Sequence, residues 1–179
     1  TKDGQYVVKI PFKRDRGLLG RSREIASRRL NMIERKMEKN DEFKISYKLF
    51  MKEYEELNHM TEFNDTGKHD VGYYIPHHAV IKSDSLTTKV RVVFDASAKT
   101  NTGLSLNNVM CVGPTLQQDI FNIVLRFRKY NYVMTGDVAM MYRRILIAEE
   151  DRDYQKILWD DKCYKLNTVT YGTASAPYL

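Results

Sequence analysis

Asp137 is the residue best placed to do chemistry. It follows the apolar run YNYVMTG and precedes the short amphipathic segment VAMMY. A carboxylate at the end of a buried strand loses its hydration, and a divalent metal ion is a common way to offset that cost. An aspartate at such a position also serves well as the N-cap of a helix. Asp137 is therefore a candidate metal ligand, with the N-cap as the structural alternative.

Two further segments carry residues suited to binding a nucleotide. Residues 89–95, KVRVVFD, predict a strand that presents Arg91 and Asp95 on one face. A guanidinium suits phosphate recognition, and Asp95 could hold it in place. Residues 168–178, TVTYGTASAPY, predict a strand that runs into Gly172. Glycine lets a backbone come close to a flat ligand such as a base pair.

Hydrophobic periodicity predicts the elements that position these residues. A strand is expected over 6–10, a helix from the N-cap Ser22 to about Lys39, a second helix capped by Asp41, and a polar loop over 58–70. The remaining predicted elements are strands over 73–82 and 89–94, an irregular stretch over 96–114, a helix from Pro114 to about Arg128 with Leu116, Ile120, Phe121, Val124 and Leu125 inward, and strands over 130–135, 144–147, 155–159 and 164–170. Helices among antiparallel strands predict an α+β fold.

Composition excludes several classes of protein. The 179 residues are 42% hydrophobic, which is enough for a packed core, and no apolar run is long enough to span a membrane. The two cysteines predict neither a disulfide framework nor a zinc site. His59 and His69 lack partners at metal-binding spacing, and His77 and His78 favour a structural or template-contact role over metal binding.

The excess positive charge is concentrated near the start of the chain. The net charge is +6, and residues 9–35 hold nine basic and three acidic residues, which accounts for all of it. Arg21, Arg28 and Arg35 recur every seven residues, so they fall roughly on one helix face. A clustered basic face indicates an anionic partner, and a solvated face without a partner is the alternative.

Several motifs together resemble the reverse transcriptase of Bel/Pao-type LTR retrotransposons. They appear in the order YYIPHHAVIK, TTKVRVVFDASAKT, GLSLNN, GPTLQQD, LRFR, DVAMMYRRI and TVTYGTASAP. The resemblance runs over nearly the whole chain. It implies the fingers and part of the palm of a right-hand polymerase, with residues 1–70 leading into the fingers, 71–129 forming the fingers and 130–179 a partial palm.

The resemblance also implies roles for single residues at the polymerase site. Asp137 matches the first catalytic aspartate, which binds two Mg²⁺ ions together with the backbone carbonyl of the next residue, here Val138. Tyr142 falls where a ring excludes the 2′-hydroxyl of ribonucleotides, with palm packing as the alternative. Arg91 matches the fingers arginine that grips the incoming triphosphate. Lys82 or Lys89 supplies the fingers lysine, and both possibilities stay open.

Further matches concern the template and the nascent base pair. Tyr171, Gly172 and Pro177 match the segment that lies against them, and Asp95 fits either a position near the template or a structural partner for Arg91. Residues 9–35 lead into the fingers, so Arg21, Arg28 and Arg35 are expected to meet template phosphates. The implied ligands are an RNA or DNA template with its primer and deoxynucleoside triphosphates.

The family's remaining carboxylates are expected beyond this sequence. They lie in a Tyr-x-Asp-Asp hairpin after the Gly172 segment, whereas Asp160 and Asp161 precede that segment and read as a turn. The 179 residues are therefore not expected to polymerise by themselves. The implied partner is the rest of a polyprotein (palm, thumb, RNase H and integrase), located in the cytoplasm, in virus-like particles or in the nucleus. A catalytically inactive, domesticated nucleic-acid-binding remnant is the alternative.

Overall fold

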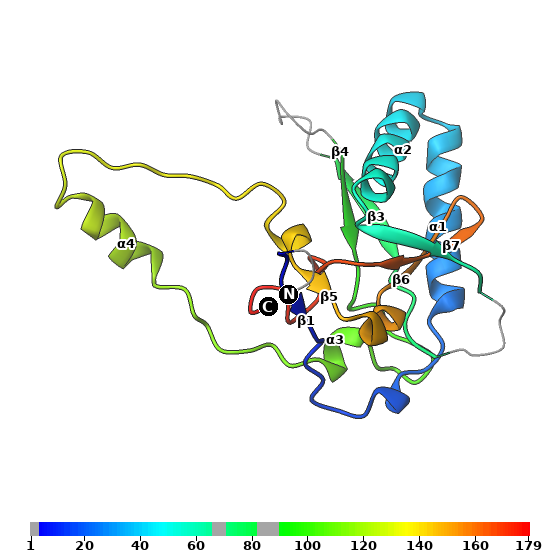
Figure 1. Cartoon of the computed structure of the whole chain (residues 1–179). Coiled ribbons are helices and arrows are strands. Elements are labelled where there is room, and N and C mark those ends of the chain that lie inside the picture. The colour runs from blue at the N-terminus through cyan, green and yellow to red at the C-terminus, as the bar shows by residue number, and fades with distance from the viewer. Residues whose placement is uncertain (1–3, 66–70, 82–89) are drawn as a thin grey trace.

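Two amphipathic helices lie side by side against the strands of the body (Figure 1). The computed structural model describes residues 4–65, 71–81 and 90–179. Helix α1 spans Arg23–Glu38 and helix α2 spans Asp41–Glu56, close to the predicted bounds. Their inward faces follow the helical period. The buried residues are Ala26, Leu30, Ile33 and Met37 of α1 and Phe43, Tyr47, Met51 and Tyr54 of α2.

Ser22 is the N-cap residue of α1, as predicted, but the N-cap of α2 differs from the prediction. The Ser22 hydroxyl makes no capping bond and instead accepts the backbone N–H of Tyr74 at 2.7 Å, which ties the start of α1 to a distant strand. Helix α2 is capped by Asn40, whose side chain accepts the N–H of Phe43 at 2.9 Å, and not by Asp41. Asp41 lies in the first turn, where a negative charge still favours the helix dipole.

A three-stranded antiparallel sheet has the order β2-β7-β6, formed by Met60–Phe63, Lys162–Leu166 and Lys156–Trp159. Strand β2 lies where a loop was predicted, because pairing with β7, a hundred residues away, orders this polar segment. Strands β6 and β7 are joined by Asp160 and Asp161, both at positive φ (50° and 59°), as a tight two-residue hairpin requires. The predicted turn at these residues is confirmed.

A second antiparallel pair is formed by β3 (His77–Ile81) and β4 (Val90–Phe94), in register from His77↔Phe94 to Ile81↔Val90. Both strands were predicted, although the expected strand ends at Lys82 and Lys89 lie outside the described residues. The segment before β3 continues onto β6, because Ile75 donates to the Lys156 carbonyl at 2.7 Å. The hairpin is thereby joined to the three-stranded sheet.

A short parallel pair links the beginning of the chain to its second half. Strand β1 (Val7–Val8) pairs with β5 (Leu146–Ile147). The 3-10 helices η1, η2 and η3 span Arg16–Leu18, Met141–Arg144 and Glu149–Tyr154. The buried carboxylate of Asp151 accepts from the Ile10 N–H at 2.8 Å and from Arg16 Nη1 at 3.0 Å, so it fixes the N-terminal segment to η3.

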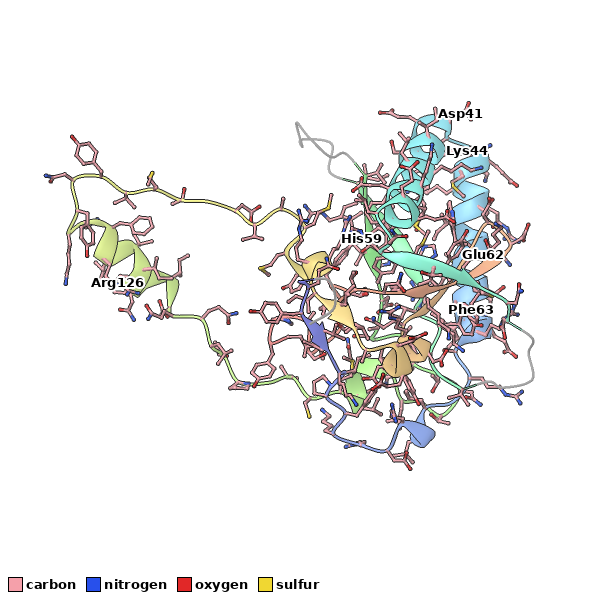
Figure 2. The ribbon with its side chains drawn as sticks, in the orientation of Figure 1. Asp41, Lys44, His59, Glu62, Phe63 and Arg126 are labelled. Atoms are coloured by element: carbon pink, nitrogen blue, oxygen red, sulfur yellow. The ribbon has the colours of Figure 1, made fainter. Side chains whose placement is uncertain are left out.

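The chain that leads into η2 leaves the body as an arm (Figure 1). The short helix α3 (Leu106–Val109) precedes it in the stretch predicted to be irregular, closed by a capping box between Ser105 and Asn108. The arm carries α4 (Ile120–Phe127), which begins at the cap Asp119 and not at Pro114. Figure 2 shows its side chains, Arg126 among them, standing clear of the body.

Two predictions for the arm are wrong. The apolar face of α4 was expected inward, but Leu116, Ile120, Phe121, Val124 and Leu125 are all exposed. The strand predicted over 130–135 is extended chain outside any sheet, with Tyr132 92% and Met134 95% exposed. Periodicity indicates which side chains need burial, but it does not supply the surface that buries them. No helix among the described residues is long and apolar enough to cross a membrane.

Candidate nucleotide site

A cavity of about 650 Å³ opens between α2, β4, η2 and the segment after β7. Four residues from three of the sequence motifs meet here: Arg91, Asp137, Tyr142 and Tyr171. Its other lining residues are Phe50, Glu53, Val90, Met140, Met141 and Arg143. The cavity therefore combines two guanidinium groups, two carboxylates and an aromatic wall.

Arg91 projects from β4 as an exposed side chain, so its guanidinium is accessible from the cavity. The prediction that Asp95 could hold it is wrong. Asp95 lies toward α1, with its Oδ2 3.9 Å from Arg29 Nη2, and its Oδ1 accepts the N–H of Ser97 at 3.1 Å. Two residues at i and i+4 share a face of a strand, but they lie two pleats apart.

Asp137 lies at the root of the arm, exposed and in extended chain. It neither ends a buried strand nor caps a helix, since Met140 is the residue before η2. The described residues contain no group of three or more His, Cys, Asp or Glu side chains that could hold a metal ion. Glu53, the second carboxylate of the cavity, is paired with Arg143 at 3.4 Å. These residues do not complete a site for two Mg²⁺ ions.

Tyr142 and Arg143 lie on η2, which begins after Met140 in the left-handed conformation (φ 55°). Tyr142 is half-buried and packs on the edge of the core. The Arg143 guanidinium lies over the rings of Tyr54 and Phe50, 4.5 and 5.4 Å from their centroids. Sequence reasoning missed Arg143, because nothing in MYRR distinguishes it from its exposed neighbour Arg144.

Tyr171 is fixed to β4 at the inner side of the cavity. Its O–H donates to the Val92 carbonyl, and its ring centroid lies 5.6 Å from that of Phe94. Burial raises the pKa of the Tyr171 hydroxyl, and the nearby positive charges of Arg143 and Arg91 oppose that rise. The phenol therefore stays protonated and brings no charge to the cavity.

Gly172 allows a close approach, but the partner is the protein itself. Its φ is 95°, and a Cβ at this position would overlap the carbonyl oxygen of Phe94. The Gly172 carbonyl accepts from Asn107 Nδ2 at 3.0 Å, and Asn107 Oδ1 accepts the N–H of Ala174 at 2.7 Å. Pro177 is exposed and lies outside the cavity lining. The segment is thus held against β4 and α3.

A second, basic cavity of about 620 Å³ lies at the start of α1. Its lining residues are Arg21, Arg23, Glu24, Ser27 and Arg28. Arg21 and Arg28, two of the three arginines predicted to contact the template, line this cavity, whereas Arg35 is exposed further along α1. Arg23, which the seven-residue spacing did not single out, lies 3.3 Å from Asp65 and 5.9 Å from the Tyr74 ring centroid. In Figure 1, α1 and the arm are on opposite sides of the body.

Two of the histidines that the sequence singled out, His59 and His77, are buried in the core. His77 Nε2 bonds the Leu158 carbonyl at 2.8 Å, which leaves Nδ1 to accept from the Tyr47 hydroxyl. His59, labelled in Figure 2, is buried, and its ring centroid lies 5.4 Å from that of Tyr54 in an edge-to-face arrangement. Burial lowers the pKa of both to about 4, with Arg143 and Arg144 adding to the effect at His59. Both rings are neutral at pH 7.

Foamy viral protease-reverse transcriptases are solved structures with a similar fold. One in complex with dsDNA has a TM-score of 0.56 and 17% identity, covering 75% of this chain and 25% of that chain. One in complex with RNA/DNA hybrid has a TM-score of 0.55 and 15% identity, covering 77% and 16%. A selenomethionine-labelled mutant from prototype foamy virus has a TM-score of 0.54 and 18% identity, covering 77% of this chain and 16% of that chain.

The chain has a reverse-transcriptase-like fold. It spans a quarter or less of the length of these three structures. No protein-family model and no curated protein matches it.

Proposed function

We propose that this chain is the fingers and part of the palm of a Bel/Pao-type retrotransposon reverse transcriptase. The observation that carries the proposal is the convergence of Arg91, Asp137, Tyr142 and Tyr171 on one cavity. These residues come from three motifs separated by up to eighty positions, so their meeting is not a consequence of sequence proximity. The proposed ligand of the cavity is an incoming deoxynucleoside triphosphate.

Each residue has a proposed part in binding that ligand. Arg91 holds the triphosphate through charge-assisted hydrogen bonds. Tyr142 crowds the 2′ position of the sugar, and Tyr171 lies against the base. Asp137 and the Val138 carbonyl supply ligands for Mg²⁺, but one free carboxylate does not hold two ions. In this proposal the other carboxylates come from elsewhere in a polyprotein that also carries the thumb, RNase H and integrase, and that acts in the cytoplasm, in virus-like particles or in the nucleus.

Nucleotide binding tests this proposal directly. Titration of the chain with a fluorescent deoxynucleoside triphosphate, in the presence of Mg²⁺ and a template-primer duplex, gives the Kd. Removing the charge in Arg91→Gln is expected to raise Kd about tenfold or more, since hydrogen bonds between charged groups contribute about 1.5–3 kcal/mol. Arg144→Gln removes an exposed arginine outside the cavity lining and is the matched control. Equal Kd values for both variants would contradict the proposed site.

A nucleic-acid-binding remnant without polymerase chemistry is the second candidate. The basic cavity at the start of α1 and the single free carboxylate at Asp137 favour it. The two candidates differ in the nucleotide titration, because a remnant binds duplex but no deoxynucleoside triphosphate. Under both, a primer-extension assay on these 179 residues is expected to show no incorporation. Incorporation would mean that the missing ligands are supplied within the chain.

A further inference from the structure

Arg143 is a mostly buried arginine in the wall of the nucleotide cavity. Its side chain is 14% exposed, whereas Arg144 beside it is exposed to solvent. The guanidinium is covered by Phe50 and Tyr54 and reaches the Glu53 carboxylate at 3.4 Å. All three partners lie on α2, so one side chain connects η2 to that helix.

The chain on the N-terminal side of η2 has few other supports, whereas its C-terminal side continues into β5 and the Ile145 carbonyl accepts the Val169 N–H at 2.9 Å. Residues 132–138 are extended and outside any sheet, and the chain returns to the body only at η2. A 3-10 helix of four residues has weak internal hydrogen bonds. Here they run from the Arg143 N–H to the Met140 carbonyl at 2.8 Å and from the Ile145 N–H to the Tyr142 carbonyl at 3.3 Å. The N-terminal end of η2 therefore depends on side-chain contacts with the body.

Removing this side chain costs more free energy than the loss of its one ion pair alone. A planar guanidinium stacks on two rings and bonds a carboxylate at once, which an ammonium cannot do. Removing it leaves the Glu53 carboxylate without its partner and exposes the rings of Phe50 and Tyr54. Because these contacts already use the guanidinium, it is poorly available to a ligand.

We propose that Arg143 is a positioning residue that fixes η2 against α2, and through it the place of Tyr142 in the cavity. The inference rests on the proposed nucleotide site and adds a residue to it. We call the contacts of Arg143 with α2 the clamp. Asp137 lies only a few residues before Met140, so the clamp also limits where the chain around Asp137 can lie. In this arrangement Arg91 contacts the phosphate, and Arg143 acts through its neighbour.

Hydrogen exchange by NMR tests the clamp without any ligand. In Arg143→Met, the amides of Arg143 and Ile145 are expected to exchange at least tenfold faster, while the amide of Ile75, bonded to Lys156, keeps its rate. Arg143→Lys keeps the charge but not the stacking, and it is expected to resemble Arg143→Met. Arg144→Met is the matched control and should match the wild type. Equal acceleration at all three amides would show global destabilisation and overturn the clamp.

Nucleotide selectivity tests the positioning role. The ratio of Kd for a ribonucleoside triphosphate to Kd for its deoxy counterpart depends on where the Tyr142 ring lies. Arg143→Met and Arg143→Lys are expected to reduce that ratio severalfold, and Arg144→Met to leave it unchanged. A wild-type preference that persists in Arg143→Met overturns the positioning role alone. Absence of any nucleotide binding by the wild type contradicts the proposed function, and the positioning role falls with it.

Discussion

Lowering the pH should destabilise the folded chain through His77. This ring is 3% exposed and lies among aromatic side chains, with its two nitrogens occupied by Leu158 and Tyr47. Burial lowers its pKa to about 4 from 6.5. A proton on Nδ1 would place a charge in the core and a donor where Tyr47 already donates.

The sign and size of the effect follow from the two pKa values. Above pH 6.5 the ring is neutral in both states, so protonation does not affect the free energy of unfolding. As pH falls below 6.5, this histidine binds a proton in the unfolded chain but not in the folded chain. The free energy of unfolding therefore declines until about pH 4. The full loss is about 3 kcal/mol, of which about 2 kcal/mol has occurred by pH 5.

Urea unfolding at pH 7 and pH 5 measures this loss. The single tryptophan, Trp159, stacks on Tyr47 at 5.2 Å and lies 6.1 Å from His77, so its fluorescence reports on this part of the core. His77→Gln keeps an N–H for the Leu158 carbonyl but has no proton to gain. The wild type should lose about 2 kcal/mol more than this variant. His59, whose pKa is also lowered, contributes equally to both proteins. Equal losses would refute the reasoning.

Three further outcomes are expected. Gly172→Ala should destabilise the chain by about 3 kcal/mol in thermal or urea unfolding, because φ of 95° and overlap with the Phe94 carbonyl both oppose a side chain, and an unchanged midpoint would contradict this geometry. The exposed apolar arm should promote association, so light scattering is expected to show oligomers at high concentration, whereas a monodisperse monomer would argue against it. Replacing Arg21, Arg28 and Arg35 together by Gln should weaken duplex binding and flatten its dependence on salt, and an unchanged slope would remove them from the interface.

The sequence predicted those elements whose hydrophobic or turn pattern lies within one short segment of the chain. The stripes of α1 and α2 are periodic over four turns, and the β3–β4 hairpin and the Asp160–Asp161 turn are encoded by neighbouring residues. The prediction failed where the partner is distant. Strand β2 depends on β7, and the Ser22 hydroxyl bonds the backbone of Tyr74 instead of capping α1.

The sequence by itself determined which residues have the chemistry for a nucleotide site. Arg91, Asp137, Tyr142 and Tyr171 could be named from motifs, because residue type and short-range order are properties of the chain alone. Only the tertiary structure decided that they share a cavity, that Asp95 turns to Arg29, and that Arg143 rather than Arg144 is clamped on α2. Contacts between segments dozens of residues apart depend on packing, and local pattern carries no information about which distant surface a side chain will meet.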